Sequence, residues 1–247
     1  ALAATTLADV ADAPILLNPT ETLDPRVEAE IKRLAALGQS RNQKVTVHVL
    51  GGTDALDHAV FNAIDSLANV DKTVRYQGVD RYETAATLAG ATISTGIASG
   101  AGKKDVNVYL TTGHDFADAL SAGAAAANND GVVLLTAGEE LDRRGFTEDF
   151  LVNLETWVLD EAWDINTSEI FTVGGPSTRA AAAFDIRTAA SYWGADRYET
   201  AVKTAEGVFD LSPVGRDNFA VVSGHTYADA LVASGFIANL DGPLLLT

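Results

Sequence analysis

Short apolar runs alternate with longer segments of helical pattern through the middle of the chain. Val106–Leu110 and Val132–Leu135 are apolar runs without polar alternation, and the alanine-rich stretch Asp115–Asn128 lies between them. Runs of this kind, separated by helices, are typical of a parallel sheet that is covered on both faces. The pattern predicts a doubly wound α/β fold. It continues with a helix at Leu141–Leu154, a charged surface excursion at Trp157–Thr167, a strand at Ile170–Val173 and a helix at Ser177–Ala190.

The same pattern occurs more than once. Gly78–Ala86 is GVDRYETAA and Gly194–Val202 is GADRYETAV, and a second shared block follows each copy. That block is TGHDFADAL, ending at Leu120, and SGHTYADAL, ending at Leu231. Because the period is long, each unit approaches the size of a small domain. The chain is therefore expected to be an array of one unit, which favours a surface presented several times over a single active site.

A third alignment sets the expected repeat boundaries. Ala1–Leu17 matches Ala119–Leu135 and Ala230–Leu246, so we expect an internal helix and strand there rather than the end of a signal peptide. The predicted organisation is a partial first repeat in residues 1–77, a complete second repeat in 78–193 and a partial third repeat in 194–247. Tandem arrays normally close with atypical capping repeats, so the chain is expected to be a piece of a longer protein.

Composition narrows the function further. The chain has 247 residues, of which 47% are hydrophobic, and this is enough for a sizeable core. The formal net charge is −17, and no basic stripe for nucleic acid is found. No apolar run reaches the length of a membrane span. There is no cysteine, which excludes disulfides, thiolate catalysis and cysteine metal sites.

The DRYET blocks have the spacing of a helix capping box. Asp80 with Glu83, and Asp196 with Glu199, are placed to satisfy the first backbone amides of a helix. This interpretation leaves the arginines and tyrosines unexplained. A guanidinium suits phosphate or carboxylate, although a structural ion pair explains it equally well. The residues left open between packing and ligand binding are Arg81, Tyr82, Arg197 and Tyr198.

The glycine-containing turns carry the remaining candidate chemistry. His114 and His225 follow a glycine at the carboxyl end of a predicted strand, where open α/β sheets bind ligands. Four histidines offer too few partners for a zinc site. The Gly174–Gly175 pair is expected to form a tight turn capped by Ser177, since no P-loop lysine accompanies it. No nucleophile, base and acid stand together, so the chain is not expected to be an enzyme and no cofactor is predicted.

The repeated DRYET and ADAL blocks and the glycine turns, in their order along the chain, resemble the type-2 cell-wall-binding repeat, a family of prokaryotic surface proteins. The resemblance covers nearly the whole chain. The resemblance implies Rossmann-like or Toprim-like α/β units, three of which pack in a pseudo-threefold array. It also implies a cell-surface or extracellular location and non-covalent anchoring to an anionic cell-wall polysaccharide or teichoic-acid-like polymer.

By position, the family's PILL motif falls on residues 14–17, 132–135 and 243–246, although the middle copy has Val132-Val133 in place of proline and isoleucine. A net charge of −17 should repel an anionic polymer, which Ca²⁺ bridging, local arginine clusters or a saline habitat would each resolve. The expected polymer-binding residues are Ile15, Leu16, Leu17, Leu134, Leu135, Arg81, Tyr82, Arg197 and Tyr198, together with His114 and His225.

Two alternatives stay open at this point. One is a structural S-layer or filament subunit that binds other copies of itself, since head-to-tail contacts that do not close generate filaments. The other is a hydrolase that uses His114 with Asp118, or His225 with Asp229, at the turns.

Overall fold

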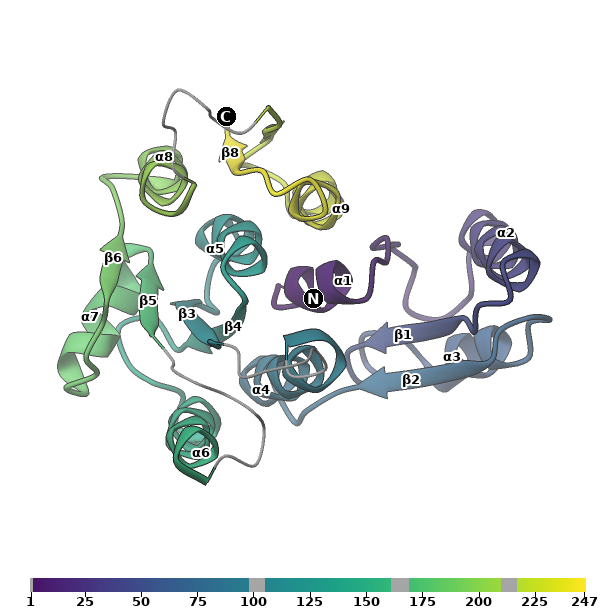
Figure 1. Cartoon of the computed structure of the whole chain (residues 1–247), viewed down its shortest axis with the longest axis horizontal. Coiled ribbons are helices and arrows are strands. Elements are labelled where there is room, and N and C mark those ends of the chain that lie inside the picture. Colours follow the sequence, from purple (N-terminus) through teal and green to yellow (C-terminus); the bar gives the residue numbers. More distant parts are fainter. Residues whose placement is uncertain (1, 98–104, 161–168, 210–216) are drawn as a thin grey trace. The chain divides into compact units, whose positions relative to one another are not determined.

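The computed structural model describes residues 2–97, 105–160, 169–209 and 217–247, and the chain divides into two compact units (Figure 1). The smaller unit contains Leu16–Asp80, and the larger one combines Leu2–Ile15 with Arg81–Thr247. Each unit has a parallel sheet and a hydrophobic core of its own. Among the described helices, none is both long enough and apolar enough to cross a membrane.

The smaller unit is built around two parallel strands, β1 (Thr46–Leu50) and β2 (Lys72–Tyr76). Helix α3 (His58–Asp65) connects them, and α2 (Pro25–Ser40) precedes them. Aspartates begin both helices: the side chains of Asp24 and Asp57 accept hydrogen bonds from backbone amides two residues further on. The core of this unit contains Ile31, Val49, Val60 and Ile64.

The larger unit contains a four-stranded parallel sheet of order β4-β3-β5-β6. The strands are β3 (Asn107–Thr112), β4 (Gly131–Thr136), β5 (Ile170–Val173) and β6 (Ala190–Tyr192). Helix α5 (Ala117–Asn128) packs against β3 and β4 on one face, and α4 (Arg81–Thr92), α6 (Phe146–Asp160) and α7 (Gly175–Ala183) lie on the other (Figure 1). The predicted α/β fold with a parallel sheet is thus confirmed.

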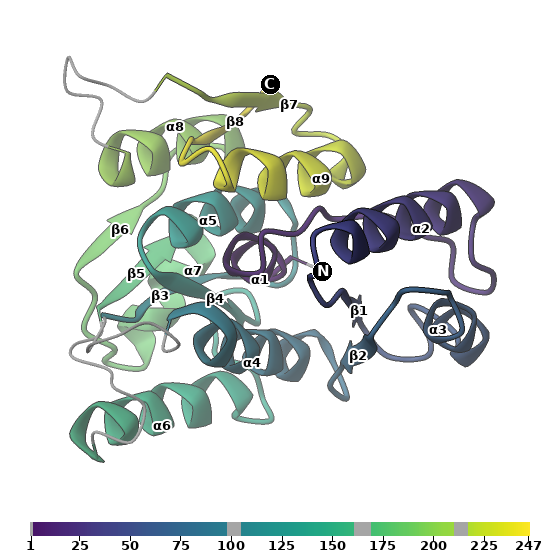
Figure 2. The same cartoon turned by 45° about the vertical axis from the view of Figure 1, so that its right-hand side comes forward.

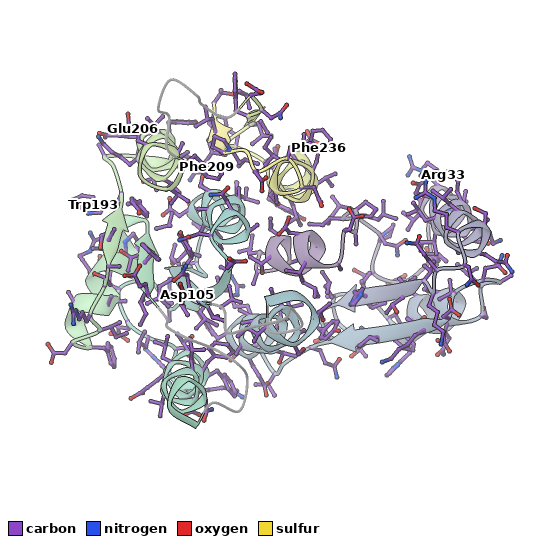
Figure 3. The ribbon with its side chains drawn as sticks, viewed as in Figure 1. Arg33, Asp105, Trp193, Glu206, Phe209 and Phe236 are labelled. Carbon is purple, nitrogen blue, oxygen red and sulfur yellow. The ribbon has the colours of Figure 1, made fainter. Side chains whose placement is uncertain are left out.

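The larger unit also contains a two-stranded parallel sheet, which repeats the β3-β4 part of the four-stranded sheet. It consists of β7 (Ala220–Val222) and β8 (Leu244–Leu246), joined by α9 (Tyr227–Ala238). Helix α8 (Arg197–Val208) packs on β8 as α4 packs on β4. Phe209, at the end of α8, is buried between α8 and α5, whereas Phe236 on α9 is 66% exposed (Figure 3).

Several predicted boundaries were wrong for identifiable reasons. Helix α6 begins at Phe146, because the Asp142 carboxylate accepts from the amides of Arg144, Phe146 and Thr147 and forms the preceding turn. The helix expected at Ser177–Ala190 ends at Ala183. Asp185 takes a left-handed conformation, with φ 52°, and the chain then enters β6.

Two other predictions concern segments outside regular strands. Helix α6 extends to Asp160, so the expected surface excursion at 157–167 begins as helix, and residues 161–168 lie outside the described part of the chain. Residues 14–17 do not form the expected strand. The equivalent strands β4 and β8 pair with β3 and β7, and no described strand pairs with residues 14–17.

Three equivalent helices pack together within the larger unit. Helix α1 (Thr5–Val10), α5 and α9 contact one another pairwise (Figure 2). Thr5, Gly123 and Ser234 occupy the same position in the three copies. The hydroxyls of Thr5 and Ser234 are 2.8 Å apart and buried, and a Cβ on Gly123 would lie 2.8 Å from the Thr5 Oγ1. These three small residues therefore set how closely the helices approach.

The packing also explains why the compact units do not coincide with the sequence repeats. Helix α1 belongs to the first repeat by sequence, but it packs with α5 and α9 and is part of the larger unit. The repeat boundaries at residues 78 and 194 stay predictions, because compactness follows packing rather than sequence repetition.

Substitution of Gly123 tests this junction. Gly123→Ala is expected to lower the free energy of unfolding by about 1–3 kcal/mol, because the new methyl group overpacks the contact with Thr5. Gly90 in α4 provides the matched control, since a Cβ there meets nothing within 4 Å. Gly90→Ala should raise stability by about 0.5–1 kcal/mol through helix propensity. Urea denaturation measures both, and a Gly123→Ala variant as stable as Gly90→Ala would contradict the assignment.

Candidate functional site

Helices α4 and α8, which begin with the DRYET blocks, meet the turns at the carboxyl ends of β3 and β7. These turns are residues 112–114 and 223–225, and we call them the SGH-type turns. Arg81, the first residue of α4, donates from Nη1 to the carbonyl oxygen of Gly113. Arg197, the first residue of α8, makes the same bond to the carbonyl oxygen of Gly224. The two arginines are thus fixed twice in the same way, each against the turn that follows a strand.

Glycine at both turns leaves room for the arginine and tyrosine side chains, which lie directly against them. A Cβ on Gly113 would lie 3.1 Å from Arg81 Cδ and 3.1 Å from Tyr82 Cε1. A Cβ on Gly224 would lie 2.9 Å from Tyr198 Cε1. Leu135 of β4 and Leu246 of β8 lie against the same two glycines. Three of the repeated sequence blocks therefore converge on one place in each copy.

The capping interpretation is confirmed for the second DRYET copy. The Asp196 carboxylate accepts from the amides of Tyr198, at 3.0 Å, and Glu199, at 2.9 Å. Glu199 Oε2 accepts from the amide of Ala195 at 2.8 Å, one residue before the cap. The acids of this block therefore begin the helix, and this leaves its arginine and tyrosine for other roles.

Each of the two turns also carries an exposed histidine. His225 Nε2 lies 3.3 Å from the Tyr198 hydroxyl. His114 occupies the equivalent position and lies against Gly138, where a Cβ would be 3.1 Å from its Nδ1. We call Arg81, Tyr82 and His114, and likewise Arg197, Tyr198 and His225, the two Arg–Tyr–His clusters.

Arg197 also contacts the turn between β3 and α5. Its Nη2 donates to Asp115 Oδ2 at 2.9 Å, and its guanidinium lies 5.5 Å from the centre of the Phe116 ring. Phe116 in turn meets Tyr227 edge to face, with ring centroids 6.1 Å apart. Sequence reasoning missed this contact, although Asp115 and Phe116 lie within a recognised block. The only signal was the repeat order itself, which places one copy's turn beside the next copy's helix.

Asp118 fills the space that the Gly174 turn leaves open. Gly174 has φ 97°, and a Cβ there would overlap the Asp118 carboxylate, 2.1 Å from Oδ2. Burial, followed by the charge of Asp115, raises the pKa of Asp118 to about 6, while Arg197 opposes the shift. The expected Ser177 cap was wrong, because its hydroxyl donates backward to the carbonyl oxygens of Val173 and Gly174. The glycine pair thus serves a turn that accommodates a carboxylate.

The predicted PILL residues lie in different environments. Leu134 and Leu135 are 0% and 3% exposed in the core of the sheet, so they stabilise the fold and present no surface to a polymer. Ile15 is half-buried against α9, with its Cδ1 3.1 Å from the Cβ position of Gly235. Leu16 and Leu17, in the smaller unit, are 39% and 42% exposed.

Within the described ranges, no group of three or more His, Asp and Glu side chains is placed to hold a metal ion. The hydrogen bonds of these ranges join neither His114 to Asp118 nor His225 to Asp229; the ring of His225 contacts Tyr198 instead. The larger unit is thus a repeat structure of parallel strands and helices in which the same Arg–Tyr–His cluster occurs twice.

The sequence matches the family model of Cell wall binding domain 2 (CWB2) over residues 75–180 and 192–247. The chain belongs to this family. It is a cell-wall-binding module of the cell surface, and the predicted resemblance is confirmed.

Solved structures share the fold. Cwp8 from Clostridium difficile matches with a TM-score of 0.74 and 24% identity, over 100% of this chain and 38% of that one. Cwp6 from Clostridium difficile matches with a TM-score of 0.73 and 22% identity, over 100% of this chain and 35% of that one. The chain thus spans little more than a third of either protein. A comparison with curated protein sequences gave no match.

The raised pKa of Asp118 predicts a specific pH dependence of stability. Its pKa is about 6 in the folded chain, above the ordinary aspartate value of 3.8. The folded state therefore binds the proton more tightly, and the free energy of unfolding falls as the pH rises through this window. Asp118→Asn should remove that loss and be more stable than the wild type above about pH 7.

Denaturant unfolding across this pH range checks the prediction. Asp229→Asn is the matched control, because Asp229 holds the equivalent position in the third repeat but is exposed. A wild type and an Asp118→Asn variant with the same pH profile would show that Asp118 is not responsible.

Proposed function

We propose that this chain anchors a surface protein non-covalently to an anionic secondary polymer of the cell wall. The polymer would be a polysaccharide or a teichoic-acid-like chain, and the two Arg–Tyr–His clusters would bind it. The observation that carries the proposal is that each cluster is built in the same way, with an arginine bonded to the glycine carbonyl of the turn. A repeated ligand is well matched by a repeated site, since linked sites gain affinity through effective concentration.

The clusters offer groups suited to such a polymer. A guanidinium has five N–H donors, so the bond to the glycine carbonyl leaves others for a phosphate or carboxylate oxygen. His114 and His225 are exposed at the turns, and the Tyr198 hydroxyl lies beside His225. Together these groups can donate to acidic groups and exchange hydrogen bonds with sugar hydroxyls.

The charge of the chain makes local recognition important. The net charge is −17, and Arg197 is already paired with Asp115. Repulsion of an anionic polymer reaches about 30 Å at 0.01 M ionic strength but only about 8 Å at 0.15 M. We therefore propose binding under screened conditions, with Ca²⁺ bridging between carboxylates and polymer as one way to lower the repulsion further. Binding assays with Ca²⁺ and with a chelator separate the two contributions.

We further propose that the functional repeat runs from residue 78 to residue 193. This division is supported by packing, because α4 covers the sheet that follows it as α8 covers the next one. Each repeat then contains one DRYET helix, one SGH-type turn and the strands that follow this turn before the next repeat begins.

The proposal predicts polymer-dependent binding that needs the turn histidines. The chain should sediment with purified cell walls and fail to do so with walls from which the secondary polymer has been removed. The double variant His114→Ala/His225→Ala should bind at least about tenfold more weakly, which corresponds to about 1.4 kcal/mol. Its fold should be unchanged, since both side chains are exposed.

His58→Ala is the matched control, because His58 is exposed at the start of α3, in the smaller unit. It should bind as the wild type does. Equal binding of the wild type to stripped and intact walls would refute polymer anchoring. Full binding by the double variant would refute the assignment of the clusters alone.

A further inference from the structure

At the junction of α1, α5 and α9, each helix is followed by an aspartate in an unfavourable backbone conformation. Asp12, Asp130 and Asp241 occupy equivalent positions in the turns that follow α1, α5 and α9. All three are left-handed, with φ of 47°, 44° and 52°. Glycine or asparagine normally occupies such a position after a helix. A carboxylate there also faces the negative end of the helix dipole.

A fourth carboxylate from α1 lies near these three. Asp9 is half-buried, one residue before the end of α1. Burial, followed by the charges of Asp241, Asp130 and Asp12, raises the pKa of Asp9 to about 6. The three contributing aspartates follow three helices that pack pairwise, so the copies place negative charge at the same end of the junction.

Nothing in the surrounding packing neutralises this charge within the described residues. Helix α4 and the π-helical segment η1 (Ile93–Ile97) also pack against α1. Their contacts come from the Thr92 hydroxyl, which lies 3.3 Å from that of Thr6, and from Gly96, which lies against Val10. The ion pairs formed by the described lysines and arginines involve other carboxylates.

We propose that this acidic end makes the three-helix junction a proton-sensitive joint between repeats, which tightens on acidification and loosens as Asp9 ionises. An attractive and a repulsive interaction act on opposite ends of the short helix α1. The small residues Thr5 and Ser234 hold α1 against α9 by a buried hydroxyl contact, and the carboxylates at the far end repel one another. Helix α1 has only 6 residues, so it is the element that the repulsion displaces most readily.

The direction of the effect follows from proton linkage. A carboxyl whose folded pKa lies above its unfolded value binds its proton more tightly in the packed state. Packing of α1 is therefore strongest at low pH and weakens as the pH rises through about 6. Since one pKa unit is a factor of ten, the change in the opening equilibrium of α1 is at most about a hundredfold.

Hydrogen exchange of the α1 amides tests the proposal, with rates corrected for intrinsic exchange and a chelator present so that protons are the only variable. In the wild type, protection of residues 5–10 should fall as the pH rises from about 5 to about 7.5, relative to the amides of β3. Asp9→Asn should abolish this fall. The triple variant Asp12→Asn/Asp130→Asn/Asp241→Asn should keep the fall but move its midpoint to lower pH.

Asp185→Asn is the matched control, because Asp185 is also left-handed, with φ 52°, in the turn after α7. It should leave the pH profile of α1 unchanged. The proposal is overturned if Asp9→Asn keeps the wild-type profile, if the triple variant leaves the midpoint where it was, or if protection of α1 rises with pH.

Discussion

Close approach of three helices through small side chains is the constraint on which the larger unit depends. At the position shared by Thr5, Gly123 and Ser234, the two hydroxyls lie 2.8 Å apart and a Cβ on Gly123 would lie 2.8 Å from the Thr5 Oγ1. Because α5 and α9 begin at the SGH-type turns, the junction also fixes where those turns lie. The same approach brings the opposite ends of the helices, with their aspartates, together. Packing and surface chemistry thus have a common origin in small side chains.

The arginines connect this framework to the surface. Arg197 bonds to the turn of its own repeat through Gly224 and to the preceding repeat through Asp115. Arg197 therefore belongs both to the proposed binding surface and to the contact between α8 and the turn that precedes α5.

The sequence predicted the elements whose signal is local. The strand Ile170–Val173 has the predicted bounds, and the Asp196 cap follows directly from capping-box spacing. Repetition added the rest of the site, since the DRYET, SGH and PILL blocks recur together. What the sequence could not predict depends on tertiary contacts: the Arg197–Asp115 pair spans 82 positions, and burial of Leu134 follows from helices on both faces of its sheet. The end of α7 depended on the left-handed Asp185, which an alanine-rich pattern conceals.

The central claim is that equivalent positions of separate repeats meet at the junction, and a cysteine pair tests it most directly. The chain contains no cysteine, so Thr5→Cys/Ser234→Cys introduces a single pair. The hydroxyl oxygens that the sulfurs replace are 2.8 Å apart, and a disulfide bond is about 2.05 Å long. Mild oxidation should consume both thiols and give a monomer with one intramolecular disulfide. Two free thiols, or disulfides only between molecules, would contradict the account.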